Sequence, residues 1–473
     1  MRLRTIFAGL LILAGAGHFH DALAGGFLLY EHNATGTGMC SARTASADDP
    51  SALYYNPAAI TELEGIQLQL GFTGILPYTH YEPAEGYDQR NFTYTNASGQ
   101  PVNKPVNDGQ NPADTIVKFF NPIHLYATWR PESLPMAVGF SLTNPFGLGT
   151  YWKGDWDGRF IATETEIRTF FNNPVIAVDI AELAGFKDDF KLSLAVGYMF
   201  VYGQAHLAKK VDLRAAEMFS RGAVVDPKAD MRMNGDAIGH GWNVALYAEL
   251  PKLLSVGFSL RSGVSLPFEG TAKFGFTSEA DQMAREIMAG AGVVFPDETT
   301  GSVTIDLPLH FNAGVAYTGI DRLKLAVDFY MAFFRSYDKL EITFDCVEEG
   351  TCYDGLNTTL DKNWGSSWQI SIGGEYYVLD QVPVRLGWGT VSSPVPKKTY
   401  DPSLPDGQRQ LITVGTGYHG SWWKFDIGYM LAFWKGTKDN DVGIGDSLNP
   451  EGRALGTYET FSHLLALTFT ARI

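Results

Sequence analysis

The sequence has no run of about 18 or more uncharged apolar residues, so it offers no candidate for a membrane-spanning α-helix. Charged residues make up only 19% of its 473 residues, which is low for a soluble protein. Basic residues are scarce as well: 36 Lys and Arg stand against 52 Asp and Glu, for a net charge of −16. Such a charge repels a phosphate backbone and excludes nucleic acid as a partner. If the chain lies in a membrane, it must cross it as strands.

Cysteine is nearly absent, with three residues in the whole chain. Cys346 and Cys352 lie close together in a polar segment, where an oxidising compartment would let them form a disulfide, and Cys40 is left unpaired. We expect neither a metal site nor a cofactor.

The chain begins with the features of an export signal. Arg2 and Arg4 precede an apolar run over residues 6–16, and Ala22 and Ala24 form an A-x-A cleavage site. Residues 1–24 are therefore predicted to be a signal peptide.

From residue 66 onward, apolar side chains alternate with small or polar ones. This period of two indicates strands whose two faces have different surroundings. In residues 323–329 the odd positions are apolar, and in residues 66–72 the even ones are. Fourteen segments with this pattern are found, at residues 66–77, 115–130, 136–146, 166–180, 190–204, 238–250, 254–275, 303–318, 322–344, 364–378, 382–391, 408–418, 422–436 and 459–472.

The connections between these segments alternate between short and long. The short ones lie near residues 131–135, 182–189, 251–253, 319–321, 379–381 and 419–421. This alternation is typical of an outer-membrane barrel, whereas a soluble β-sandwich or propeller would not require it. We predict an all-β fold, a 14-stranded antiparallel transmembrane β-barrel over residues 66–473. The last strand ends at Ile473 rather than at the aromatic residue common in such proteins.

The less apolar face of the strands carries many glycines, namely Gly71, Gly139, Gly197, Gly257, Gly314, Gly373, Gly387 and Gly428. Glycine weakens a strand, so its repetition suggests that a large element approaches the wall from inside. Residues 25–65, rich in small side chains, could form such a plug of short helices. Asp48 or Asp49 can cap a helix that begins at Pro50, and Asn56 one that begins at Pro57.

Several motifs resemble those of the FadL family, outer-membrane transporters of long-chain fatty acids and other hydrophobic compounds. The most specific one resembles the N-terminal hatch of the family, here residues 25–65, with Asn56, Pro57 and Ala58 as its motif. The other similar segments are Gly26-Phe27, residues 36–50, Asn144-Pro145-Phe146-Gly147 with Trp156 and Arg159, Asn173-Pro174, and Arg261-Ser262.

The resemblance covers nearly the whole mature chain. It implies a monomeric barrel in the outer membrane of a Gram-negative bacterium, closed by the hatch and surrounded by outer-membrane lipids. It also implies passive, ligand-gated diffusion of hydrophobic small molecules through a lateral opening in the wall. Long-chain fatty acids are the expected ligands, and monoaromatic hydrocarbons are the alternative within the family.

The resemblance also indicates where the gate lies. The lateral opening of the family comes from a kink in strand three, and in this sequence strand three runs into Asn144, Pro145, Phe146 and Gly147. Proline removes a hydrogen-bond donor from the ladder there, and glycine permits a bend. We expect residues 144–147 to shape the gate; the alternative is an ordinary strand end that enters a loop. Phe27 and Leu28 resemble the family segment that reaches the binding pocket.

Two loops carry amphipathic segments. In residues 280–289, Met283 and Ile287 fall on one helical face together with Met288, and residues 213–219 show a similar pattern. Such a pair of helices could form an apolar capture groove with adaptable methionines, or could simply pack on the rim of the barrel.

A carboxylate head group would need a cationic partner inside the barrel. By strand parity Arg261 and Arg385 point inward and are candidates, the alternative being salt bridges to hatch carboxylates such as Asp48. Lys324 and Lys424 also point inward. Each has an aspartate further on along the same face, four residues on at 328 and two residues on at 426, and is expected to form an ion pair with it.

Two alternatives from other classes remain at this point. An outer-membrane lipid hydrolase would need a nucleophile and a base, but His124, His310 and His463 have no Ser or Asp partner at a familiar spacing. A hydrophilic porin would need a wet, charged lumen without a hatch.

Overall fold

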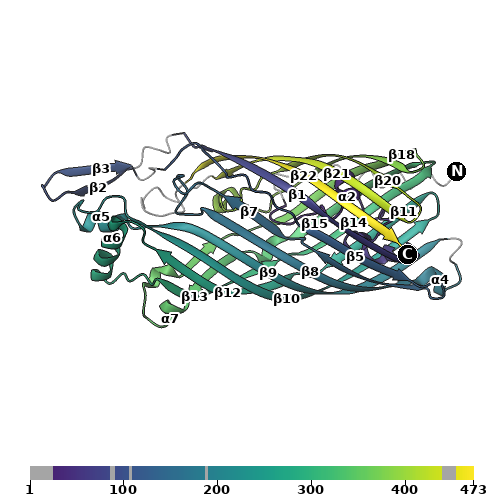
Figure 1. Cartoon of the computed structure of the whole chain (residues 1–473), viewed down its shortest axis with the longest axis horizontal. Helices are drawn as coiled ribbons and strands as arrows, with labels where there is room; N and C mark the ends of the chain where they lie inside the picture. The colour runs from purple at the N-terminus through teal and green to yellow at the C-terminus, as the bar shows by residue number, and fades with distance from the viewer. Residues whose placement is uncertain (1–24, 86–90, 106–108, 187–189, 439–453) are drawn as a thin grey trace.

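The computed structural model of the chain describes residues 25–85, 91–105, 109–186, 190–438 and 454–473 (Figure 1). The predicted signal peptide lies outside the described residues. One antiparallel sheet closes on itself, because β1 (Gly65–Pro83) pairs with β22 (Gly456–Arg472) along its whole length, with Leu70 opposite Phe469. The predicted 14-stranded barrel is thereby confirmed.

Several of the fourteen wall strands are interrupted and therefore carry two labels. In chain order they are β1; β4 (Ala113–Asp114) with β5 (Ile123–Arg130); β6 (Met136–Thr143) with β7 (Gly147–Tyr151); β8 (Glu164–Asp179); β9 (Lys191–Asp212); β10 (Lys228–Leu250); β11 (Leu254–Arg261) with β12 (Val264–Gly275); β13 (Glu298–Leu307) with β14 (Leu309–Ile320); β15 (Leu323–Phe333) with β16 (Lys339–Phe344); β17 (Thr358–Asp361) with β18 (Ser366–Leu379); β19 (Val382–Val391); β20 (Arg409–His419); β21 (Trp423–Lys438); and β22.

The two ends of the barrel differ. The short connections, the helix α4 (Ile180–Leu183) and the C-terminus lie at one end, and the long loops extend from the other (Figure 1). The long loops carry a separate hairpin, β2 (Asn91–Thr95) with β3 (Pro101–Pro105), and the helices α5 (Arg214–Phe219), α6 (Glu279–Gly290) and α7 (Asp345–Glu348). Short 3₁₀ turns are η3 (Phe334–Ser336), η4 (Asp354–Leu356) and η5 (Lys397–Thr399).

The outward face of the wall is an apolar belt. Leu68, Leu70 and Phe72 on β1 are exposed there, as are Leu465 and Phe469 on β22, and the residues between them point inward. A barrel with such an apolar outer surface must be embedded in a lipid bilayer. Among the described helices, none combines the length and the apolarity needed to cross a membrane.

Residues of the hatch form three short elements: α2 (Ala34–Gly38), α3 (Ala52–Tyr55) and η1 (Pro57–Glu62). As predicted, Asn56 caps the turn that begins at Pro57, and its side chain accepts a hydrogen bond from the Ala58 N–H (3.2 Å). The helix predicted to start at Pro50 starts at Ala52 instead. The side chain of Asp49 instead accepts a hydrogen bond from the Ser51 N–H (2.9 Å), in the turn that precedes the helix.

The inward glycines bring the backbones of hatch and wall together. Six of the eight have the hatch as close neighbour, namely Gly139, Gly257, Gly314, Gly373, Gly387 and Gly428. At Gly428 a Cβ would overlap the carbonyl oxygen of Ala34, so only glycine admits α2 at this distance. Gly71 and Gly197 instead face side chains of neighbouring strands, with His124 beside the former and Asn173 beside the latter.

Candidate functional site

The third wall strand is broken where the sequence predicted a bend. β6 ends at Thr143 and β7 begins at Gly147, and both pair with β8. Asn144 replaces the missing ladder bonds: its side-chain N–H donates to Thr169 O (2.6 Å) and its oxygen accepts from Ile123 N–H (2.9 Å). We call residues 144–147 the wall break.

The start of the hatch adds to the wall at this break. Leu29 N–H donates to Pro145 O (2.8 Å), and Gly147 N–H donates to Phe27 O (3.0 Å). Leu28 thereby lies opposite Phe146 in a short antiparallel bridge. The segment that the resemblance linked to the binding pocket is thus hydrogen-bonded directly to the wall break.

Above the hatch the lumen is apolar and rich in aromatic rings. The ring of Phe27 is buried, with centroids 5.8 Å from Phe146, 5.6 Å from Phe334 and 5.8 Å from Trp364. These residues belong to one large buried cluster that draws on most of the wall strands. Porin channels have polar interiors, so this lumen suits an apolar solute better than a hydrated one.

A cavity of about 370 Å³ lies beside the wall break. We call it the wall cavity. Its walls come from the hatch start, including Phe27 and Leu29, from residues 144–151, from the segment between β4 and β5, and from the end of the loop before β20. Most of its surface is apolar, and it shares Phe27, Phe146 and Ile167 with the apolar cluster of the lumen.

Arg409, at the start of β20, lines this cavity. Its guanidinium donates to Gly26 O (2.6 Å) and to Asp406 Oδ1 (3.1 Å), and it lies over the ring of Trp434. Among the described residues, its buried Nε has no hydrogen-bond partner. Our sequence analysis missed this arginine, although strand parity places it on the same inward face as Thr413.

Two carboxyl groups lie near Arg409. Burial raises the pKa of Glu31 in the hatch, and burial also raises that of Asp406, against the opposing effect of Arg409. Burial thus disfavours the anionic form of both groups, while the ion pair of Asp406 with Arg409 opposes this effect.

The arginines expected to bind a ligand are engaged with the protein itself. Arg261 donates to Leu53 O (3.1 Å) and Tyr54 O (2.7 Å) in the hatch. Arg385 lies between Glu375 (2.6 Å) and Asp426 (2.7 Å). Neither lines the wall cavity, and a ligand role for them stays a prediction that would require the hatch to shift.

The expected ion pairs of the two inward lysines are wrong. Lys324 reaches the hatch carboxylate of Asp48 at 2.6 Å instead of Asp328, which accepts from Thr44 N–H at 2.7 Å. Asp426 pairs with Arg385 and not with Lys424. The hatch supplies the partner in the first case, and sequence spacing along one strand carries no information about it.

The loop helix predicted near residues 280–289 is α6, and it lies beside α5 (Figure 1). Burial alone would raise the pKa of Asp281, but hydrogen bonds from the backbone N–H groups of Lys228 and Ser278 hold it below its usual range. Of the proposed capture residues, Met283 is 48% exposed. Ile287 is half-buried against an apolar cluster at the loop end of the barrel, which includes Leu213, Phe274 and Phe295 and which we call the rim cluster. Met218 and Phe219 of α5 are also exposed.

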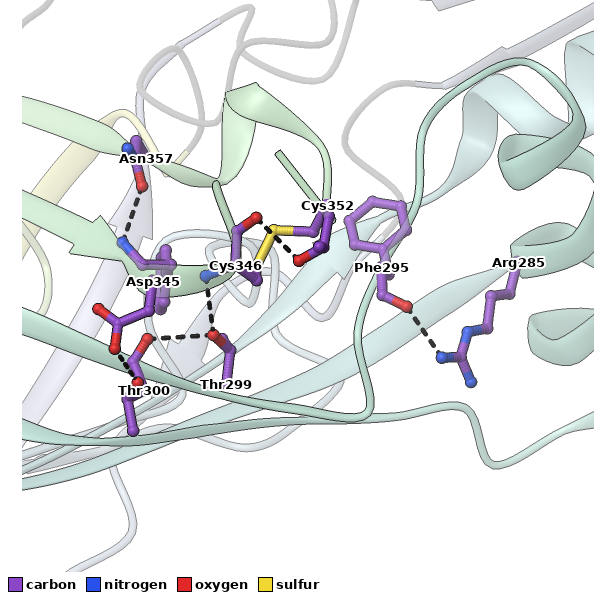
Figure 2. Close-up of a disulfide and its surroundings, with 10 residues drawn as sticks. Arg285, Phe295, Thr299, Thr300, Asp345, Cys346, Cys352 and Asn357 are labelled. Carbon is purple, nitrogen blue, oxygen red and sulfur yellow. Dashed lines mark hydrogen bonds between the residues drawn. A yellow bond between two sulfur atoms is a disulfide. The ribbon is translucent and has the colours of Figure 1, made fainter. Parts of the chain in front are cut away.

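Cys346 and Cys352 form a disulfide that closes the α7 loop (Figure 2). Both sulfurs are buried in the rim cluster, and the Cys346 N–H donates to Thr299 Oγ1 on β13 (3.3 Å). The disulfide closes the loop on itself, and the hydrogen bond to Thr299 attaches the loop to the barrel rim.

Replacing both of these cysteines with alanine should loosen this loop by about 2 kcal/mol, the value expected for closing a short loop. Hydrogen exchange measured on residues 345–357 should become faster, while exchange in β18 and β19 stays unchanged. Equal exchange of the loop in both proteins would show that the rim cluster holds it without the disulfide.

The family model for outer membrane protein transport proteins (OMPP1/FadL/TodX) matches residues 18–473. The chain belongs to this family. It is therefore an outer-membrane β-barrel of a non-enzymatic channel family that transports hydrophobic compounds. Membership excludes the lipid hydrolase, and the apolar lumen opposes the hydrophilic porin.

Individual relatives are distant but match along most of their length. An outer membrane protein of Neisseria meningitidis serogroup B is 23% identical over 97% of each chain. The long-chain fatty acid transport protein of Salmonella typhi is 24% identical over 88% of this chain and 89% of that protein.

Two solved structures are similar to this one. A FadL homologue from Pseudomonas aeruginosa gives a TM-score of 0.76 at 20% identity, covering 95% of this chain and 100% of that one. The toluene transporter TbuX of Ralstonia pickettii gives 0.63 at 14% identity, covering 93% and 98%. At these identities the likeness shows a shared fold.

Proposed function

We propose that this protein moves long-chain fatty acids across the outer membrane by passive, ligand-gated diffusion, with exit through the wall break. The observation that carries the proposal is the apolar lining that the lumen shares with the wall cavity, a cavity also lined by Arg409 and by the wall break. The fatty acid transport protein of Salmonella typhi, similar along most of its length, supports the same ligand class.

The route begins at the long loops. Met218, Phe219 and Met283 offer exposed apolar side chains for capture, and flexible methionines adapt to chains of different shape. From there the acyl chain enters the aromatic lumen. To reach the wall cavity it displaces Phe27, which fills the space between Phe146 and Trp364.

Arg409 is the group that recognises the head group. A ligand carboxylate takes the free Nε and competes with Gly26 O for the guanidinium. Gly26 N–H also donates to Asp406 (3.1 Å), which itself pairs with Arg409. Binding of a carboxylate to Arg409 therefore weakens the hydrogen bonds of both the N–H and the C=O group of Gly26. Head-group binding is thereby coupled to release of Phe27. The whole route lies in one barrel, and we propose that a monomer suffices.

The test compares a long-chain fatty acid with the alcohol of equal chain length, both bound to detergent-solubilised protein. Arg409→Gln should weaken acid binding about 10- to 100-fold, the worth of a hydrogen bond to a charged group, and alcohol binding much less. Arg409→Lys should retain part of the difference. Arg322→Gln, on a short turn where Arg322 pairs with Asp380, is the matched control and should change neither ligand. Equal loss for acid and alcohol would contradict head-group recognition.

Monoaromatic hydrocarbons are the second candidate ligands. The aromatic lining of the wall cavity favours them, with Phe27, Phe120 and Phe146 around a volume of about 370 Å³, and the toluene transporter TbuX shares the fold. Tighter binding of toluene than of the fatty acid, insensitive to Arg409→Gln, would favour this candidate.

A further inference from the structure

The second wall strand is interrupted beside the wall break. Residues 115–122 lie between β4 and β5 without strand structure, and we call residues 116–122 the strap. On one side the strap bonds to β1, where Phe120 and Ile75 exchange backbone hydrogen bonds of 3.0 and 2.7 Å. On the other side, among the described residues, it shares a backbone hydrogen bond with β7 only at its start, where Ile116 N–H donates to Tyr151 O (2.7 Å).

Two phenylalanines of the strap lie on glycines of the flanking strands. The ring of Phe119 is 2.6 Å from where a Cβ of Gly74 on β1 would be, and the ring of Phe120 fills the Cβ position of Gly149 on β7. Gly74 has the outward parity of Phe72, and Gly149 lies opposite Glu166, which shares the outward face with the exposed Arg168. The ring of Phe119 therefore covers the wall from its outer side, and the ring of Phe120 lies in the gap beside Gly149.

The strap is held over the gap by few contacts. Near Phe120 and Gly149, no backbone hydrogen bond joins the strap to β7 among the described residues. Only the contact of the Phe120 ring with Gly149 fills the gap between them. Nearby, the ammonium of Lys118 lies 3.2 Å from the centroid of the Tyr151 ring, a cation–π contact. The wall cavity lies directly behind, and Phe119 and Phe120 form part of its lining.

We propose that the strap is the lipid-side door of the wall opening, and that the contact of Phe120 with Gly149 limits the cross-section of the apolar molecule that passes into the membrane. The proposal rests on the proposed function, because it takes the wall cavity as the ligand route. It adds a second closure, independent of the hatch, that selects unbranched chains over wide ring systems.

The first experiment locks the door. Phe120→Cys combined with Gly149→Cys, bridged by a short bis-methanethiosulfonate reagent from which each cysteine thiolate displaces a sulfinate, should bind a fluorescent fatty acid like wild type. It should release the ligand into proteoliposome lipid at least about tenfold more slowly, since a closed wall must open for exit. Cleaving the bridge should restore the rate. Wild type under the same reagents controls for Cys346 and Cys352.

The second experiment opens the door. Phe120→Ala should speed the release of a bulky ring-bearing carboxylic acid several-fold and leave a straight-chain acid nearly unchanged, because only the wide molecule is limited by the ring. Phe329→Ala removes a lipid-facing ring of 39% exposure elsewhere on the wall and should alter neither rate.

The outcomes separate the two proposals. If wild type transfers fatty acid into the lipid and the bridged variant does so equally fast, the strap is overturned alone. If wild type itself binds no fatty acid or transfers none, the proposed function is overturned and the strap with it.

Discussion

Gly428→Val should unseat the hatch and turn the barrel into an open pore. The isopropyl group would occupy the position of the Ala34 carbonyl and lie about 3 Å from Gly38 N, so α2 could not approach the wall. Valine is favourable in a strand, and the barrel itself should therefore form normally. Single-channel conductance in planar bilayers should rise at least about tenfold, because the bore of a 14-stranded barrel without its plug is wide enough for hydrated ions.

The matched control places the same side chain where there is room. At Gly275, on β12, a Cβ would make an ordinary contact of 3.6 Å with Asp230, so Gly275→Val should leave the conductance low. A folded Gly428→Val barrel with wild-type conductance would mean that the hatch does not depend on this close approach.

Gly147→Leu should abolish most of the uptake of hydrophobic ligands without affecting the barrel. The new side chain would begin 3.3 Å from Leu29 Cδ1 and extend into the wall cavity, between the hatch start and the wall break. A filled cavity leaves no passage at the break, and we expect the initial rate of fatty acid uptake by cells to fall about tenfold or more.

The control for this change is Gly154→Leu, in a loop position where the nearest neighbour of a Cβ would be Lys210 at 3.9 Å. It should take up ligand at the wild-type rate. Wild-type uptake by Gly147→Leu, with the protein present in the outer membrane at a normal level, would show that the route does not pass the wall break.

Much of the architecture follows from local pattern. A strand with lipid on one side and protein on the other must alternate its side chains, and so fourteen periodic segments already imply the barrel. Proline and glycine act on the backbone where they stand, which is why Pro145 and Gly147 predicted the break in strand three. The glycines of the inward face indicated a plug for the same reason.

The site itself could be predicted less well. Parity showed that Arg261, Arg385 and Lys324 point inward, but it did not show what they meet. Arg261 meets backbone carbonyls of α3, and Lys324 meets Asp48, more than half the chain away in sequence. Nor did it show that Arg409 lies beside Gly26 and the wall cavity.

By itself, the sequence determined that this chain forms a plugged barrel with an oily exterior, because periodicity, small residues and turn lengths each act within a few residues of one another. The tertiary structure alone decided which cation lines the cavity, which carboxylates the buried cations meet and which rings lie at the wall break. Those properties depend on where the hatch and the strap come to lie against strands distant in the chain, and a buried charge acquires its partner only when the fold is complete.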